Sequence, residues 1–102
     1  MKNENAKKIL VITRADVASE MEEEYNRWYN EEHLPSLLKV RGVLSGTRGV
    51  NTGNGQKYIA VYVHENAEVQ KSAAYKKAVE TEWTQKIRPY IKNFTRENYE
   101  IL

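Results

Sequence analysis

The chain has 102 residues, of which 40% are hydrophobic and 29% are charged. A chain of this length has room for one domain with one core, and its patterned apolar stretches exclude a disordered protein. Sixteen basic and fourteen acidic residues are mixed along the chain and give a formal net charge of +2, which does not call for nucleic acid. We therefore expect a single globular domain spanning residues 1–102.

Cysteine is absent, which excludes disulfides, a thiolate nucleophile and a cysteine metal site and favours a reducing cytoplasm. No apolar run approaches the length of about 18 residues that a membrane span needs, and the start MKNENAKK lacks the apolar core of a signal peptide. The two histidines form no His-x-x-x-His pair, so we expect no metal site. The expected protein is soluble, cytoplasmic and free of membrane contacts.

The first predicted strand is KKILVITRA, in which apolar residues run from Ile9 to Ile12 as in a strand buried on both faces. A helix should follow, because Ser19 and Glu22 match a capping box and glutamates crowd the first turn. The apolar residues of this helix share one face, which predicts contact with a sheet: Met21, Tyr25, Trp28 and Tyr29.

Pro35 predicts the end of this first helix. The residue before a proline avoids the α region, so the helix should break near His33 and Leu34. The stretch PSLLKV should then restart as a short turn with Pro35 at its first position, and Gly42 should end it.

A β-hairpin is expected next, because VLSGTRGV and QKYIAVYVH both alternate and are joined by NTGNG, which is rich in residues that tolerate positive φ. In the second strand the side chains divide into two rows, one of Ile59, Val61 and Val63 and the other of Tyr58, Ala60, Tyr62 and His64. Both rows are bulky, so neither face of this strand is expected to lie in water.

A second helix and a last strand complete the pattern. After Asn66, a candidate cap, one apolar face recurs every four residues: Tyr75, Val79, Trp83 and Ile87. Pro89 should end or kink this helix before the strand NFTRENYEIL. The order β-α-β-β-α-β predicts an α+β, ferredoxin-like fold in which both helices cover one face of a four-stranded antiparallel sheet. The other face would expose an apolar patch, so we expect two copies to pack sheet to sheet.

The stretches RWYNEEHLPSLLKVRGV, GTRGV, KYIAVYV and ETEWTQKIRPYIKNFTRENYEIL together resemble the dimeric α+β barrel proteins, in particular the branch related to the ethyl tert-butyl ether degradation (EthD) proteins. The most specific parts are the helix end from Trp28 to Pro35 and the Trp83-Thr84 segment. One departure is Arg41, because members usually have proline before the glycine that is Gly42 here.

The resemblance implies a homodimer whose two sheets close into a barrel, with a pocket between sheet and helices in each subunit. Relatives on this fold include cofactor-free monooxygenases, polyketide cyclases, lactone isomerases and stress-response proteins, so the fold does not determine the function.

His33 is the leading candidate for a catalytic residue. It shares a helical face with Tyr29 and lies beside Pro35, so it could reach a pocket mouth as a general acid or base, helped by the tyrosine hydroxyl. The alternative is that its ring caps the helix end by donating to the last carbonyls.

The candidate ligand-binding residues are aromatic or basic: Trp28, Arg48, Tyr58, Tyr62, His64 and Trp83. Three of them share one strand face with Arg48 as a candidate neighbour, a mixture suited to an acidic or phenolic substrate. The alternative is that this face fills a dimer interface, where tyrosine and arginine are enriched. Trp28 and Tyr29 are also typical of core packing.

Two classes of function fit these residues. The first is a protein that binds an aromatic or hydrophobic carbonyl compound, with cofactor-free lyase, isomerase, cyclase or monooxygenase chemistry through His33. The alternative is a non-catalytic protein that self-associates or serves in a stress response. An RNA-recognition module shares the element order, but the first strand has no aromatic residue and Ala60 separates the tyrosines of the third, so no nucleic acid partner is expected.

Overall fold

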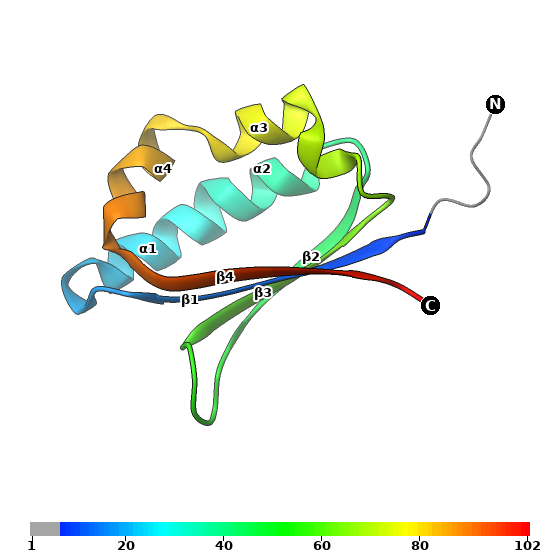
Figure 1. The fold of residues 1–102 in the computed structure, drawn as a ribbon. Helices are drawn as coiled ribbons and strands as arrows, with labels where there is room; N and C mark the ends of the chain where they lie inside the picture. Colours follow the sequence, from blue (N-terminus) through cyan, green and yellow to red (C-terminus); the bar gives the residue numbers. More distant parts are fainter. Residues whose placement is uncertain (1–6) are drawn as a thin grey trace.

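The computed structural model describes residues 7–102 and has the β-α-β-β-α-β order of a ferredoxin-like fold, as predicted. Its four strands form one antiparallel sheet in the order β2-β3-β1-β4. The helices form a layer on one face of this sheet (Figure 1). The strands are β1 (Ile9–Val17), β2 (Val43–Val50), β3 (Tyr58–His64) and β4 (Ile91–Glu100), and the helices are α1 (Glu22–Trp28), α2 (Leu34–Leu38), α3 (Ala73–Val79) and α4 (Glu82–Ile87).

The core lies between the sheet and the helical layer. On β1 it takes Ile9 and Val11, whose side chains are buried, whereas Leu10 and Ile12 on the other face are only partly buried. The prediction that this strand is buried on both faces was therefore wrong for a single copy of the chain. Ile87 of α4 is fully buried and closes the core near the chain's second proline.

The first helix begins without the predicted capping box. Ser19 opens a 3-10 turn (Ser19–Met21), and no side chain caps either this turn or α1. The carboxylate of Glu22 instead accepts hydrogen bonds from Lys57 and Tyr58. Hydrogen bonds to a charged group are stronger than those of a neutral cap. The Glu22 side chain therefore connects α1 to β3 and does not bond to the backbone amides of its own helix.

The predicted break near His33 and Leu34 was also wrong. The helix runs on through a π-helical turn, Tyr29–His33, directly into α2, and Leu34 keeps helical angles of φ −65° and ψ −48° although it precedes Pro35. A π turn inserts one extra residue and interrupts the regular ladder, so a residue that lacks an amide proton can follow it at the start of the next helix. Gly42, with φ of 96°, ends the segment as expected.

The second helical segment is two helices rather than one. α3 ends at Val79, and Thr81 caps α4 by accepting from the amide of Thr84 at 3.0 Å. The same threonine hydroxyl donates to the carboxylate of Glu32 at 2.5 Å, so this glutamate of the π turn is held by α4. The spacing of four residues between Val79 and Trp83 thus spans a helix break.

The start of α3 also differs from the prediction. Asn66 accepts from the amide of Glu68 in a turn that leads into a short 3-10 segment, Val69–Lys71. Ser72 then caps α3 by accepting from the amide of Tyr75 at 3.1 Å.

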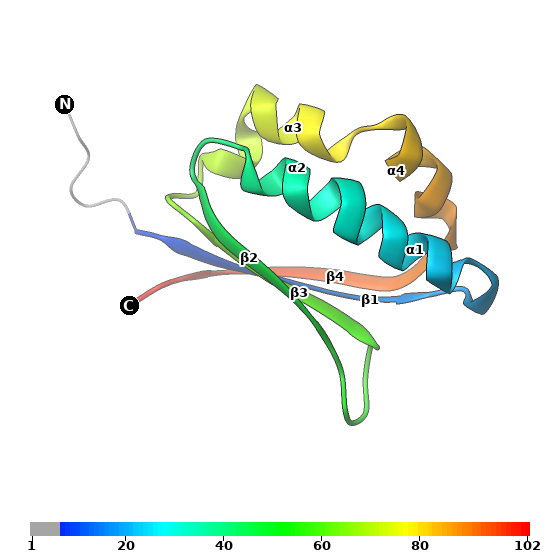
Figure 2. The ribbon, with the colours of Figure 1, turned by 180° about the vertical axis from the view of Figure 1, so that it is seen from behind.

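No helix covers the opposite face of the sheet among the described residues, as the reversed view makes clear (Figure 2). Along this face lie partly buried apolar side chains of the two central strands: Leu10, Ile12, Ile59, Val61 and Val63. Tyr99 of β4 is 49% exposed on the same face, where it lies opposite Leu10. Within residues 7–102, no helix is both long enough and apolar enough to cross a membrane.

Candidate functional site

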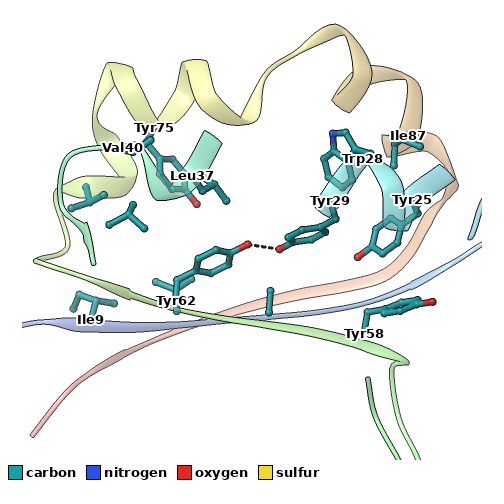
Figure 3. Packing of buried hydrophobic residues seen from close by; sticks show 14 residues of the cluster. Ile9, Tyr25, Trp28, Tyr29, Leu37, Val40, Tyr58, Tyr62, Tyr75 and Ile87 are labelled. Atoms are coloured by element: carbon teal, nitrogen blue, oxygen red, sulfur yellow. Dashed lines mark hydrogen bonds between the residues drawn. The ribbon is translucent and has the colours of Figure 1, made fainter. Parts of the chain in front are cut away.

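A cavity of about 340 Å³ lies between the sheet and the helical layer. Its lining on the sheet side includes the small residues Thr13, Ala15 and Ala60, which leave space above the strands. On the helix side, the rings of Tyr25 on α1 and Tyr29 in the π turn point toward the sheet (Figure 3). The cavity therefore exists because small residues of β1 and β3 lie under large residues of the first helix.

Two tyrosine hydroxyls meet inside this cavity. Tyr29 opens the π turn, Tyr62 rises from β3, and their hydroxyl groups share a hydrogen bond (Figure 3). The two side chains are 7% and 3% exposed. Burial raises the pKa of Tyr29 and of Tyr62 above the ordinary value, so both stay neutral at physiological pH. The pair can donate a hydrogen bond to a ligand oxygen.

His33 is held by aromatic contacts on two sides. Its ring stacks on Trp28 with centroids 4.4 Å apart, and it meets the edge of Tyr29 at 4.8 Å. Its Nδ1 is buried and has no hydrogen-bond partner among residues 7–102. Burial first, and then the positive charges of Arg48 and two further arginines, lower the pKa of His33 to about 4. The imidazole is therefore neutral at physiological pH.

The capping role considered for His33 does not occur. The helix continues for five residues beyond it, from Leu34 to Leu38. Since the π turn places His33 on the cavity side of a continuous helix, the ring lines the cavity instead.

Arg48 is on the edge strand β2, on the opposite side of the cavity from β1. Its guanidinium donates to Asn30 at 2.8 Å and to Asn26 at 2.9 Å, both through the amide oxygens. Its Cζ lies 4.3 Å from the ring centroid of Tyr29 and 5.6 Å from that of Tyr25, which are cation–π distances. Neutral partners thus fix its position without cancelling its charge.

Trp28 and Tyr58 combine core packing with polar anchoring. The indole of Trp28 is 3% exposed and donates to the hydroxyl of Thr84 at 3.2 Å, which ties α1 to α4. The hydroxyl of Tyr58 accepts from Asn26 at 3.0 Å and donates to Glu22. Both rings line the cavity, so core packing and lining are compatible roles here.

Most of the predicted site residues lie together around this cavity: His33, Tyr29, Trp28, Arg48, Tyr58 and Tyr62. His64 and Trp83 do not line it. His64 is 1% exposed and packs against Tyr75, with ring centroids 5.7 Å apart. The indole of Trp83 donates to Glu24 at 2.9 Å, which directs it along the helical layer.

The alternative that Tyr58, Tyr62 and His64 fill a sheet-to-sheet interface is excluded by their direction. These residues are buried at 7%, 3% and 1% exposure on the face that the helices cover. The apolar row of Ile59, Val61 and Val63 takes the open face instead.

Several cavity residues were not identified from the sequence, among them Phe94 and Arg96 of β4 and Arg88 after α4. The pairing of β4 with β1 shifts register between Arg14 and Asp16, which interrupts the alternation of β4 near its start. Asn93, at φ of 53°, lies in the irregular part of β4. Within residues 7–102, no group of three or more His, Asp or Glu side chains could hold a metal ion.

Comparison with solved structures finds the same fold. A dabb family protein with a ferredoxin-like fold from Mesorhizobium loti matches 94% of this chain and 98% of its own, with a TM-score of 0.71 and 13% identity. A putative antibiotic biosynthesis monooxygenase from Bordetella bronchiseptica matches 94% and 98%, with a TM-score of 0.69 and 14% identity. A conserved protein from Methanosarcina mazei matches 95% of both chains, with a TM-score of 0.68 and 13% identity.

Similarity at these identities establishes the ferredoxin-like α+β fold and not the activity. No protein-family model matches the chain, and no curated protein matches it either.

Proposed function

We propose that the protein binds an aromatic or hydrophobic carbonyl compound between sheet and helices and moves a proton on it without a cofactor. The observation that carries this proposal is the conjunction of a cavity of about 340 Å³, a buried hydroxyl pair and a buried histidine nitrogen without a partner. Ligand pockets are typically apolar and aromatic with a few polar groups, at volumes of about 300–1,000 Å³.

Each of these cavity residues has its own role in the proposed reaction. The hydroxyl pair of Tyr29 and Tyr62 donates to the carbonyl oxygen, where negative charge develops when a proton leaves the neighbouring carbon. Nδ1 of His33 accepts that proton, and the imidazolium returns it to another atom of the ligand, so the step is an isomerisation or cyclisation without net redox change. The low pKa of His33 keeps the accepting form populated at neutral pH and makes the return transfer favourable.

The test is to incubate the full chain with a panel of phenolic ketones and lactones and to follow products by mass spectrometry. We expect His33→Ala to lower turnover of an accepted compound by about 100-fold or more, the usual contribution of a general acid or base. His64→Gln is the control, because His64 is buried in the same layer but does not line the cavity, and glutamine retains much of the side-chain volume. Unchanged turnover in His33→Ala would remove its catalytic role.

We also propose that two copies pack through the open face of the sheet. The apolar row of Leu10, Ile12, Ile59, Val61 and Val63 supports this, because it lies on a face that no described helix covers. Light scattering should give twice the chain mass, and Val61→Lys should halve it while leaving the helix-facing cavity unchanged. A monomeric mass for the unsubstituted chain would contradict the proposal.

A place in the EthD-related branch of the dimeric α+β barrel proteins belongs to the same proposal. It rests on the sequence from Trp28 to Pro35 and on the Trp83-Thr84 segment. The direction of the β3 tyrosines weighs against the RNA alternative, because their rings face the helices and are not open to stack on bases.

A further inference from the structure

Four residues form one row across the sheet on its helix-facing side. Thr13 of β1 pairs with Arg96 of β4 and with Ala60 of β3, and Ala60 pairs in turn with Arg48 of β2. Neighbouring strands lie about 4.8 Å apart, so the Cα atoms of the two arginines are roughly 14 Å apart. Two long cationic side chains therefore stand at either end of a floor made of two small ones.

The charges of this row are not neutralised by acidic groups. No aspartate or glutamate is among the described residues that line the cavity. Arg48 donates to two asparagine oxygens and contacts tyrosine faces, and none of these partners carries a negative charge. A positive field in a partly enclosed, aromatic site is stronger than in water and favours an anion.

Arg96 differs from the other three arginines of the cavity in having its donors free. Arg14 forms an ion pair with Glu97. Arg88 forms an ion pair with Glu80 at 2.5 Å, and Arg48 is held by Asn26 and Asn30. Arg96 makes no hydrogen bond or ion pair with any residue in 7–102, and its Cζ lies 5.8 Å from the ring centroid of Phe94. Arg96 is exposed, as is Phe94 at 53%, and both line the cavity from β4.

We propose that the ligand is an aromatic carboxylate, with its carboxylate bound to the guanidinium of Arg96 and its ring placed over Thr13 and Ala60 toward the Tyr29–Tyr62 hydroxyls. The fork of donors on an arginine matches a carboxylate with two parallel hydrogen bonds. Arg48, at the far end of the row, adds to the positive field without direct contact. This inference rests on the proposed function and specifies the charge of the ligand.

The experiment compares two probes of the same shape, naphthoate and its neutral amide, by calorimetric titration of the full chain at low salt. We expect naphthoate to bind about tenfold more tightly or better, and added salt to reduce this preference. Arg96→Gln should abolish the preference while the affinity for the amide changes little. Arg41→Gln, which removes the same charge from an exposed turn outside the cavity, should keep it.

The outcomes separate the two proposals. Equal affinity for both probes would overturn the anionic ligand and leave binding in the cavity intact. A full preference retained in Arg96→Gln would overturn the placement of the carboxylate, and thermal unfolding of that variant would show whether its fold is intact. Binding of neither probe would count against the proposed function as well.

Discussion

The two histidines of this chain lie in the same layer between sheet and helices, and their surroundings differ. His33 is partly buried beside a cavity, and His64 is 1% exposed in closed packing. His64 pairs across the sheet with Ile9 and Val43, which are both buried, and Tyr75 packs on its ring. Apolar residues fill the space around His64, whereas small strand residues leave the space near His33 empty. Side-chain volume on the strands thus decides which histidine can meet a ligand.

A substitution that fills the cavity should have the largest effect, because it would remove the difference between the open surroundings of His33 and the closed packing around His64. Ala60 is 2% exposed and lies in the cavity floor, so Ala60→Leu places a branched side chain where the ligand ring would lie. We expect the affinity for naphthoate to fall by about 100-fold or more, with little change in stability because the added side chain enters open space. Titration calorimetry and chemical unfolding measure the two effects. Val61→Leu, on the opposite face of the same strand, is the control and should bind normally.

Truncating each histidine should give the next effect, in stability. His64→Ala leaves a hole in closed packing and should cost about 2–4 kcal/mol in the free energy of unfolding. His33→Ala enlarges a space that already exists and should cost about 1 kcal/mol or less. Urea unfolding measures both values. Equal costs would show that the two environments are packed alike.

Acid should also weaken the fold, and it should act through both histidines. Burial lowers the pKa of His64 in the folded state, with a smaller contribution from Arg96, and it lowers that of His33 to about 4. The unfolded chain therefore binds more protons below the ordinary histidine pKa of 6.5. The stability is fully present above that pH and is lost as the pH falls from 6.5 toward 4.

A series of urea unfolding curves across this pH range measures the loss. Replacing either His33 or His64 by glutamine should remove that histidine's contribution to the pH dependence of stability, because glutamine does not titrate. A stability that rises on acidification would contradict the direction of both shifts.

The fold could be predicted from the sequence because its signals are local. The alternation of Tyr58 to His64 marked a strand with two distinct faces, and the residues that tolerate positive φ before it marked a hairpin. The helix boundaries failed wherever a distant partner competed with a local one. Glu22 bonds to β3 rather than to a cap, and Thr81 bonds to Glu32 of the π turn while it starts a new helix.

The candidate site was predicted where its residues belong to one face of a regular element, as Trp28, Tyr29 and His33 do on the first helix and Tyr58 and Tyr62 do on β3. It was missed on β4, where Arg96 pairs in regular register with Thr13, but polar residues on both faces of the strand do not indicate which face turns toward the helices. His64 shares the strand face of Tyr62, but the cavity ends before it.

By itself the sequence determined the order of strands and helices and the division of β3 into two rows, because the periods of 2.0 and 3.6 residues are properties of the chain's own backbone. Only the tertiary structure decided that the tyrosine row faces the helices, that the helix passes Pro35 through a π turn, and that Arg48 and Arg96 flank one floor. These features depend on contacts such as Thr13 with Ala60 and Thr13 with Arg96, whose members lie far apart in the sequence. A local sequence pattern does not show which of these distant contacts will form.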